Sequence, residues 1–382
     1  MTEVLPQKPD KKFKRSIAES GGDDLNKCYQ CATCSAVCLL TPEDHPFPRK
    51  EMLLAQWGQS DKLVADPDVW LCHQCNDCTV RCPRGARPGD VMGAIRNYSF
   101  EHYAVPGFLG KLVSKPAGLP FLMLIPILIF VFMADWSQMA TFSGHVHFYD
   151  FLQNGPLEML FMAGNFIVLL LASFGLIRFY KGMADSWKVK PEIGFIKAAI
   201  QTVLEIISHK RFGTCDTSKY RQTAHFLVFY GFFGAAATAG LALMRMEYLH
   251  FIHPEHYALS NIPSMMLYHP IKILGNASGL AMIIGIIMMA TRHSNDPESA
   301  GVSTYAGKIF IWGIFGVAFT GMLIQFLRIG GLPTLAYAFY FIHLVFVFSL
   351  LWYAPYSQFG HMFYRTFAMI FARSINRMPQ KQ

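Results

Sequence analysis

The sequence predicts an all-α protein in two parts, a small cysteine-rich helical domain in water followed by six helices in lipid. The first observation is a repeat: "CYQCATCSAVC", which begins at Cys28, returns as "CHQCNDCTVRCP", which begins at Cys72. The second is hydrophobicity. Hydrophobic residues make up 53% of the 382 residues without counting Gly, whereas soluble domains reach ~45–50% with Gly included. The excess lies in long apolar runs after residue 116.

The change in composition along the chain predicts four segments. We expect a flexible segment over 1–22, the cysteine domain over 23–105, the membrane domain over 106–365 and a basic cytoplasmic tail over 366–382. The start, "MTEVLPQKPDKKFKR", has no apolar stretch, so we expect no cleaved signal peptide and a cytoplasmic cysteine domain. Thiols stay reduced in the cytoplasm, so regular cysteine spacing indicates metal binding. Cys215 stands outside both runs, and we expect a free thiol there.

The repeated cysteine spacing is C-x2-C-x2-C-x3-C. In bacterial ferredoxins three thiolates of such a run bind one [4Fe–4S] cluster and the fourth binds the other cluster. The predicted ligands are Cys28, Cys31, Cys34 and Cys82 for cluster 1, and Cys72, Cys75, Cys78 and Cys38 for cluster 2. Structural zinc is the alternative, but zinc sites use four ligands, commonly in two pairs. Pro83 follows the second run as in ferredoxins, whereas Leu39 follows the first.

The segment between the runs includes "PRKEMLLAQWG", in which Met52, Leu53 and Trp57 fall roughly on one helical face. We therefore expect a helical two-[4Fe–4S] ferredoxin domain of the kind found in fumarate reductase iron–sulfur subunits. The wording "CYQCATCSAVC…LCHQCNDCTVRCPRG" resembles the small iron–sulfur subunit of heterodisulfide reductase over about residues 23–97. That resemblance implies a role in electron transfer.

Six apolar stretches are long enough to span a membrane, for which about 20 residues are needed. They cover approximately 116–134, 158–179, 223–244, 270–290, 308–327 and 334–354. A buried soluble core does not explain runs such as "LPFLMLIPILIFVFMA", which are apolar on every face.

Lys and Arg in the connections predict the orientation of these spans. Connections 135–157 and 247–268 contain neither residue, whereas 180–222 contains eight. The segment after the sixth span adds Arg365, Arg373 and Arg377, whereas Arg328 falls on the other side. We therefore expect a multi-pass protein of the cytoplasmic membrane, with the cysteine domain and the C-terminus in the cytoplasm.

The basic connection contains an amphipathic pattern, because Ile193, Ile196, Ile200, Val203 and Ile207 recur at helical spacing. Two interpretations stay open. The helix lies on the membrane interface, or it packs on the cysteine domain.

Histidines in and near the spans indicate a second kind of redox site. His343 lies in the sixth span and His361 follows 18 residues later, which is five turns of one helix, ~27 Å along its axis, with a kink expected at Pro355. Ionisable groups in lipid are functional candidates by default. At matching depths lie His225 and His269. Bis-histidine haem b is therefore predicted on His225–His361 (inner) and on His269–His343 (outer), with His250, His253 and His256 as other outer-side candidates.

Residues 215–365 resemble the gamma subunit of respiratory nitrate reductase, a dihaem cytochrome b, through "AHFLVFYGFFG" and "FIHLVFVFSLL". That family places two ligands ten residues apart on the first of these helices, but Ala235 stands at the second position here. The full expectation is thus a two-[4Fe–4S] ferredoxin domain followed by a six-helix transmembrane dihaem cytochrome b domain.

These carriers predict an electron path between a soluble partner and a quinone in lipid. The chain has no G-x-G-x-x-G fingerprint and no nucleophile–base arrangement, so substrate chemistry belongs to partner subunits. Lys272 is a candidate quinone contact, or a salt-bridge partner of a haem propionate. The sequence contains no basic helix with interleaved aromatic residues, which is the pattern that would indicate binding to nucleic acid.

The fusion of the two domain types resembles the electron-transfer membrane subunits of quinone-interacting membrane-bound oxidoreductase complexes of sulfate reducers. The resemblance implies two flavoprotein/iron–sulfur partners, menaquinone as lipid carrier, and adenylylsulfate reductase as electron acceptor in sulfate reduction. A cytochrome b/iron–sulfur subunit of another heterodisulfide-reductase-like complex is the first alternative. The second, a transporter or receptor with an iron–sulfur sensor, would need a polar path through the spans, where Lys272, Asn276 and Gln325 are scattered in the sequence.

Overall fold

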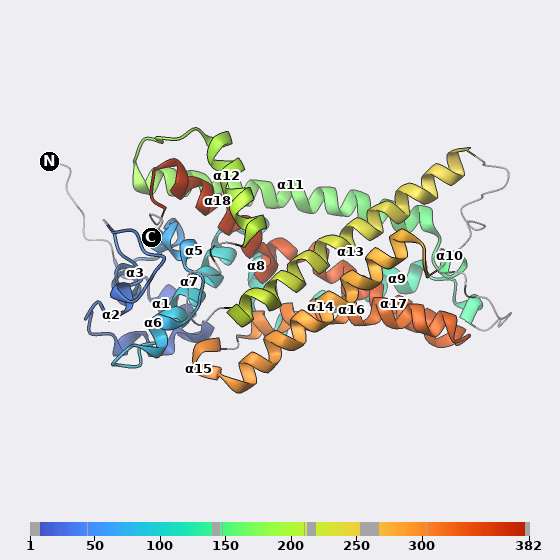
Figure 1. The fold of residues 1–382 in the computed structure, drawn as a ribbon, viewed down its shortest axis with the longest axis horizontal. Coiled ribbons are helices and arrows are strands. Elements are labelled where there is room, and N and C mark those ends of the chain that lie inside the picture. Colours follow the sequence, from blue (N-terminus) through green and yellow to red (C-terminus); the bar gives the residue numbers. More distant parts are fainter. Residues whose placement is uncertain are drawn as a thin grey trace.

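The computed structural model describes residues 8–43, 45–139, 146, 148–209, 211, 219–252, 267–302 and 304–378. These residues form helices and connecting turns without a strand, so the predicted all-α class is confirmed. The molecule is elongated, with the cysteine domain at one end and long helices running away from it (Figure 1). The first described helix, α1 (Lys11–Ile17), and the last, α18 (His361–Ser374), both lie at the cysteine-domain end (Figure 1).

The cysteine domain consists of short helices around one hydrophobic core. They are α1 (Lys11–Ile17), α2 (Thr33–Ala36), α3 (Arg49–Gln56), α4 (Ser60–Val64), α5 (Asp68–Leu71), α6 (Asp77–Val80) and α7 (Pro88–Tyr103). Asp10 begins α1, because its carboxylate accepts from the backbone N–H groups of Lys12 (2.9 Å) and Phe13 (3.1 Å). The side chains of Phe13, Met52 and Trp70 fill the core.

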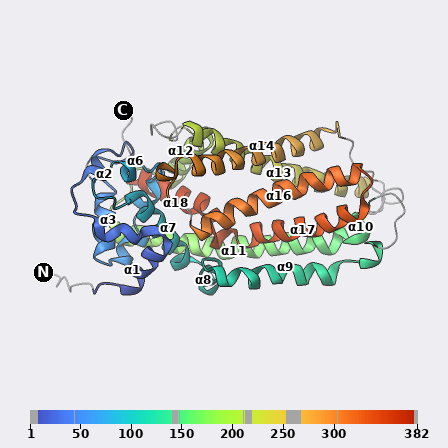
Figure 2. The same cartoon turned by 90° about the horizontal axis from the view of Figure 1, so that it is seen from below.

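The rest of the chain is a bundle of long helices, which run side by side in both views (Figures 1 and 2). They are α9 (Leu119–Met133), α11 (Asn154–Trp187), α13 (Lys219–Ile252), α14 (Pro270–Asn295), α16 (Tyr305–Ile329) and α17 (Pro333–Trp352), with α8 (Gly107–Val113), α10 (Phe148–Phe151) and α15 (Pro297–Ala300) as short connectors. Six helical segments in the described ranges, one for each predicted span, are long and apolar enough to cross a membrane. This part of the prediction is confirmed.

The amphipathic pattern of the basic connection forms α12 (Phe195–Ser208). Its small and polar face, with Ala198 and Thr202 fully buried, packs on α18 (His361–Ser374). Ile196 and Leu204 on the opposite face are exposed. The helix therefore packs on the C-terminal helix and still presents its apolar face outward.

The expected continuous helix through His343 and His361 is wrong. Helix α17 ends at Trp352, two single turns follow (Ala354–Tyr356 and Gln358–Gly360), and α18 begins at His361. Pro355 lies in the first of these turns, where its missing N–H does not interrupt a helical hydrogen bond. The two rings therefore lie on separate helices, and the five-turn spacing does not apply.

Two predicted terminal segments also differ. The expected flexible segment, 1–22, includes α1, which buries Phe13 and Ile17 completely. Part of the expected tail, 366–374, belongs to α18, whose Ala368 and Phe371 join the core of the cysteine domain. Both ends of the chain thus help to build that domain, and in Figure 2 α18 lies among its helices.

The cysteine domain docks on one end of the bundle through polar contacts. The backbone N–H of Val302, in the connection between α14 and α16, donates to Asp90 (2.9 Å). Asn76 donates to the carbonyl of Ser299 in the same connection (3.2 Å). The segments predicted to share one side of the membrane therefore lie at one end of the molecule.

Candidate functional site

The two cysteine loops have the same backbone conformation. The residues two and four positions after Cys28 are left-handed, Gln30 (φ 60°) and Ala32 (φ 68°), and so are those after Cys72, Gln74 (φ 52°) and Asn76 (φ 66°). Left-handed conformations of residues other than Gly cost ~1–2 kcal/mol each, and such turns direct backbone N–H groups into anion-binding concavities. The N–H groups of Gln30 and Gln74 approach the sulfurs of Cys28 (3.5 Å) and Cys72 (3.4 Å). The sequence repeat is therefore a structural repeat.

Cys38, the last cysteine of the first run, lies with the second run. Burial, then the neighbouring Cys72 and Cys75, raise the pKa of the Cys38 thiol to about 12. A cavity lies between Cys38, Cys72, Cys75 and Cys78. A buried thiol of this kind loses its proton when a cation takes the proton's place. The arrangement fits the predicted exchange of the fourth ligand between the runs.

Cys34 has Cys28 and Cys31 as neighbours, and burial followed by Cys28 raises the pKa of its thiol to about 11. The segment after Cys82 returns to this loop, because the Arg84 guanidinium lies 4.1 Å from the ring centroid of Tyr29. Within the described part of the chain, the eight cysteines of the two runs are free thiols. Cys215 lies outside the described residues.

His361 and His343 are held in the same tautomer. Nδ1 of His361 lies 2.5 Å from the carbonyl oxygen of Gln358, which can only accept, so Nδ1 carries the proton. Nδ1 of His343 lies 2.9 Å from the hydroxyl of Thr320, and that hydroxyl donates to the carbonyl of Gly316 (2.5 Å). Both rings therefore carry their lone pair on Nε2. Metal-bound histidines show this arrangement.

His225 reaches the same state through a second histidine. Nδ1 of His209 lies 3.0 Å from the carbonyl of Ile207, and its Nε2 lies 3.1 Å from Nδ1 of His225. The carbonyl fixes the proton of His209 on Nδ1, so Nε2 of His209 accepts the proton of His225. His225 then carries its lone pair on Nε2. Its electrostatic neighbours include His361 and His209.

Burial, together with Arg365, lowers the pKa of His361 to about 4, although the hydrogen bond to Gln358 acts the other way. The ring is therefore neutral at physiological pH, as a metal ligand must be. The structure thus brings together the predicted inner pair, His225 and His361. His209, which sequence reasoning missed, has only one signal, its position directly after an amphipathic helix.

The structure puts His269 to a different use. Its Nδ1 accepts from the backbone N–H of Ile271 (3.3 Å), so the ring begins α14 as a cap and has the opposite tautomer. Gly279 of α14 faces the side chain of Met322. The residue before Met322, Gly321, faces the His343 ring, so Gly279 lies near the level of His343. His269 lies ten residues before Gly279, ~15 Å along the helix. The two predicted outer ligands are not brought together.

The other outer-side candidates are placed as follows: His250 lies near the end of α13, whereas His253 and His256 lie outside the described residues. Ala235 packs in the cluster that contains Met282 and Ala318. Its methyl group cannot bind iron.

Lys272 belongs to a polar group between two spans. Its ammonium donates to the amide oxygen of Gln325 (3.2 Å), and the Gln325 amide nitrogen donates to Asn276 (3.0 Å). These three side chains look scattered in the sequence, but α14 and α16 bring them together.

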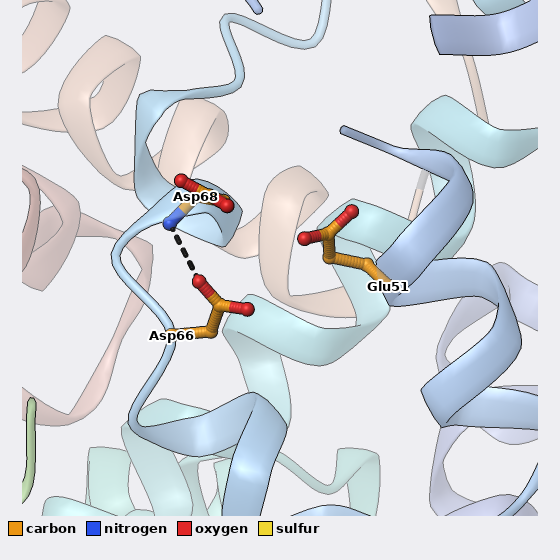
Figure 3. A group of neighbouring side chains, drawn as sticks. All are labelled: Glu51, Asp66 and Asp68. Carbon is orange, nitrogen blue, oxygen red and sulfur yellow. Dashed lines mark hydrogen bonds between the residues drawn. The ribbon is translucent and has the colours of Figure 1, made fainter. Parts of the chain in front are cut away.

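Three buried carboxylates, Glu51, Asp66 and Asp68, lie close enough together to hold a metal ion (Figure 3). The ammonium of Lys50 already lies 2.8 Å from both aspartates, and Nε of Arg377 donates to Asp68 (2.8 Å). The cation positions are therefore filled by side chains, and the group is an ion-pair cluster.

Comparison with known proteins concerns the cysteine domain. Residues 24–86 match the model of the 4Fe–4S dicluster domain family. The chain is 37% identical over 112 residues to the C subunit of the H(2):CoB-CoM heterodisulfide,ferredoxin reductase of Methanothermobacter marburgensis, a match that covers 27% of this chain and 59% of that protein. It is 36% identical over 97 residues to a protein of Archaeoglobus profundus that is named for its likeness to the C subunit of heterodisulfide reductase, covering 25% and 52%.

A more distant relative is the mitochondrial succinate dehydrogenase iron–sulfur subunit 1 of rice, 24% identical over 110 residues, covering 25% of this chain and 39% of that protein. The chain thus spans little more than half the length of its nearer relatives named above. No solved structure matches the chain. Its N-terminal part thus matches the 4Fe–4S dicluster family model and is similar to the C subunits of heterodisulfide reductases. This part is joined to six helices that are long and apolar enough to cross a membrane.

Proposed function

We propose that the chain is the membrane subunit of a quinone-dependent oxidoreductase and passes electrons between a quinone pool and soluble partners. One observation carries the proposal. His225 and His361, which both carry their lone pair on Nε2, lie at the end of the bundle on which the cysteine domain docks. A cytochrome site and an iron–sulfur domain are thus neighbours in one chain.

The cysteines fit two clusters with exchanged fourth ligands: Cys28, Cys31, Cys34 and Cys82 for the first, Cys72, Cys75, Cys78 and Cys38 for the second. His225 and His361, each with a lone pair on Nε2, would hold the iron of an inner haem b. His343 has the tautomer for an outer haem b, but the placement of His269 does not support it as the second ligand. Bound clusters and haems supply one-electron carriers.

The chain's own residues connect the two kinds of site. Arg221 donates to the carbonyl of Gln74 (2.7 Å), which lies between Cys72 and Cys75. Arg221 also lies one turn before His225 on α13. A single side chain thus links the second cysteine loop to the helix that carries an inner ligand, which keeps the route for electrons short.

On the lipid side, we place the quinone near the Lys272–Gln325–Asn276 group. An isolated Lys in lipid costs ~2.5–3.5 kcal/mol on insertion scales, so it needs polar neighbours, and Gln325 is one. The resemblance to quinone-interacting oxidoreductases implies three further features. They are menaquinone as the lipid carrier, two flavoprotein/iron–sulfur partners, and adenylylsulfate reductase as the electron acceptor in sulfate reduction. The basic connection supports a cytoplasmic cysteine domain.

A cytochrome b/iron–sulfur subunit of another heterodisulfide-reductase-like complex is the second candidate. The observation that favours it is the similarity of the cysteine domain to heterodisulfide reductase subunits. The two candidates share every site described above and differ in the proteins that copurify with the chain.

The test is the cofactor content of the anaerobically purified chain. We expect ~8 non-haem iron atoms and a low-spin b-type haem spectrum. His361→Ala should remove one haem and leave the iron–sulfur absorbance unchanged. His293→Ala, at the end of α14 nearest the cysteine domain, is the matched control and should keep both signals. Protein that binds zinc and shows neither signal would exclude the proposal.

A further inference from the structure

Four arginines from different parts of the chain converge between the second cysteine loop and the inner histidine pair. They are Arg96 on α7, Arg211 after α12, Arg221 on α13 and Arg365 on α18. All four are among the charged groups that act on His73, which lies between Cys72 and Cys75. Positive charge is thus concentrated where the cysteine domain meets the bundle.

Two of these arginines are held by neutral groups of the cysteine loop. Arg96 donates to the carbonyl of Cys72 (2.9 Å) and to the side-chain oxygen of Gln74 (2.6 Å). Arg221 donates to the backbone carbonyl of Gln74 (2.7 Å). These hydrogen bonds fix the guanidinium groups in place without neutralising their charge.

Arg365 has a buried nitrogen, Nη2, that has no hydrogen-bond partner among the residues that the structure describes. Burial, followed by Arg211 and Arg96, lowers the pKa of its guanidinium to about 9. A buried donor that is left unpaired costs ~1–3 kcal/mol, and more when it is charged. An anion bound at this site would supply the missing hydrogen-bond partner.

The positions of Arg221 and Arg365 indicate which anion. Arg221 lies four residues before His225 on α13, and Arg365 lies four residues after His361 on α18. Residues four apart share a helix face, so each predicted haem ligand has an arginine one turn away on its own helix. Glu205 of α12 is an acidic residue beside Arg211, and its carboxylate pairs with Arg211 and Arg373.

We propose that Arg221 and Arg365 bind the propionate carboxylates of the inner haem, and that Arg96 and Arg221 tie this carboxylate site to the second cysteine loop. Guanidinium groups bind carboxylates through paired, charge-assisted hydrogen bonds. The inference rests on the proposed function, because it requires a haem between His225 and His361.

The arginine charge affects the redox equilibrium of the haem iron. Positive groups beside the propionates offset their negative charge, which otherwise favours the oxidised iron. Removing one arginine charge should therefore make the inner haem harder to reduce, without removing an axial ligand.

The experiment is an anaerobic redox titration of the purified chain followed by haem absorbance. At a fixed potential, Arg365→Gln should raise the ratio of oxidised to reduced iron in one haem at least tenfold. For a one-electron carrier, a tenfold change corresponds to a reduction potential that is lower by 59 mV. Arg365→Lys, which keeps the charge, should change it less. Arg373→Gln is the control. It removes an arginine from the same helix, and this arginine pairs with Glu205.

Each other outcome has a defined meaning. Full haem occupancy with an unchanged potential in Arg365→Gln would overturn the inference, and so would a shift confined to the iron–sulfur clusters. If Arg365→Gln loses the inner haem, retention in Arg365→Lys supports carboxylate binding, whereas loss in both variants overturns it. Wild-type protein without haem would instead refute the proposed function.

Discussion

His225, His343 and His361 come from different sequence contexts but share one hydrogen-bond arrangement. Each ring directs its Nδ1 proton to an acceptor, namely His209, the Thr320 hydroxyl or the Gln358 carbonyl. The acceptor matters because it fixes which nitrogen carries the lone pair and makes that nitrogen more basic. A histidine is therefore a candidate ligand by virtue of its partner as much as its depth in the bundle.

His269 is the exception, and replacing it tests the tautomer argument. Asn is a preferred first residue of a helix, so His269→Asn should keep the cap on α14. Because the ring nitrogen that faces Ile271 is an acceptor, we expect the haem content and spectrum of this variant to equal those of the wild type. His343→Ala should lose a haem signal. Loss of one haem in His269→Asn would restore His269–His343 as the outer pair.

His209 is a positioning residue in this scheme, and its replacement gives a separate prediction. His209→Phe removes the acceptor of the His225 proton, and loss of such a partner typically costs 10–100-fold in metal affinity. We expect weaker binding of one haem and a higher reduction potential, because His225 becomes less basic. His209→Gln, which keeps an acceptor oxygen, should recover most of the wild-type potential. Equal effects of Phe and Gln would show that His209 only fills space.

At the scale of elements, local patterns were predictable and the contacts between them were not. The cysteine spacing predicted the repeated loops, and the apolar runs predicted six spans. The helix that contains His361 was misplaced because Pro355 allows either a kink or an end, and packing decides between them. His209 and the Lys272–Gln325 contact depend on residues brought together from separate helices.

The left-handed residues of the cysteine loops lead to a prediction with a matched control. Ala32 is left-handed, so Ala32→Gly should relieve ~1–2 kcal/mol of backbone strain and lose ~0.5–1 kcal/mol through the freer unfolded chain. The net expectation is ~0.5–1 kcal/mol of stabilisation. Ala36→Gly, at the end of α2, should destabilise by a similar amount. Denaturant titration of the iron–sulfur absorbance measures both, and destabilisation in both variants would contradict the loop conformation.

At the scale of the whole molecule, the ion-pair cluster joins the beginning and the end of the chain. Asp68 of the cysteine domain binds Arg377, just beyond α18. The charged groups of Lys50 and Arg377 both lie over the ring of Trp187 at the end of α11, at 5.1 Å and 4.6 Å from its centroid. Residues about 300 positions apart thus meet at one junction, which no local sequence pattern could predict. Removing one partner of a buried ion pair typically costs 3–5 kcal/mol.

This junction should weaken as the pH rises. Burial, then the Asp66 charge, raise the pKa of Glu51 to about 8, against an ordinary value of 4.5. The folded state therefore holds this proton more tightly than the unfolded state. The stability that comes from Glu51 is greatest below pH 4.5 and falls until about pH 8, where Glu51 is ionised beside Asp66 and Asp68. Since each pKa unit corresponds to ~1.4 kcal/mol, the loss over this range is on the order of a few kcal/mol.

Glu51→Gln replaces the protonated carboxyl by a neutral amide of the same shape, so it should remove this pH dependence. Thermal unfolding of the cysteine domain, followed by its iron–sulfur absorbance, should show a gain for the variant that grows between pH 6 and pH 9. Glu19→Gln is the control, because Glu19 is a surface residue paired with exposed Arg15, and its stability profile should follow the wild type. Parallel profiles for Glu51→Gln and the wild type would mean that Glu51 is already ionised at neutral pH. In that case Lys50, 3.2 Å away, outweighs both the burial of Glu51 and its acidic neighbours.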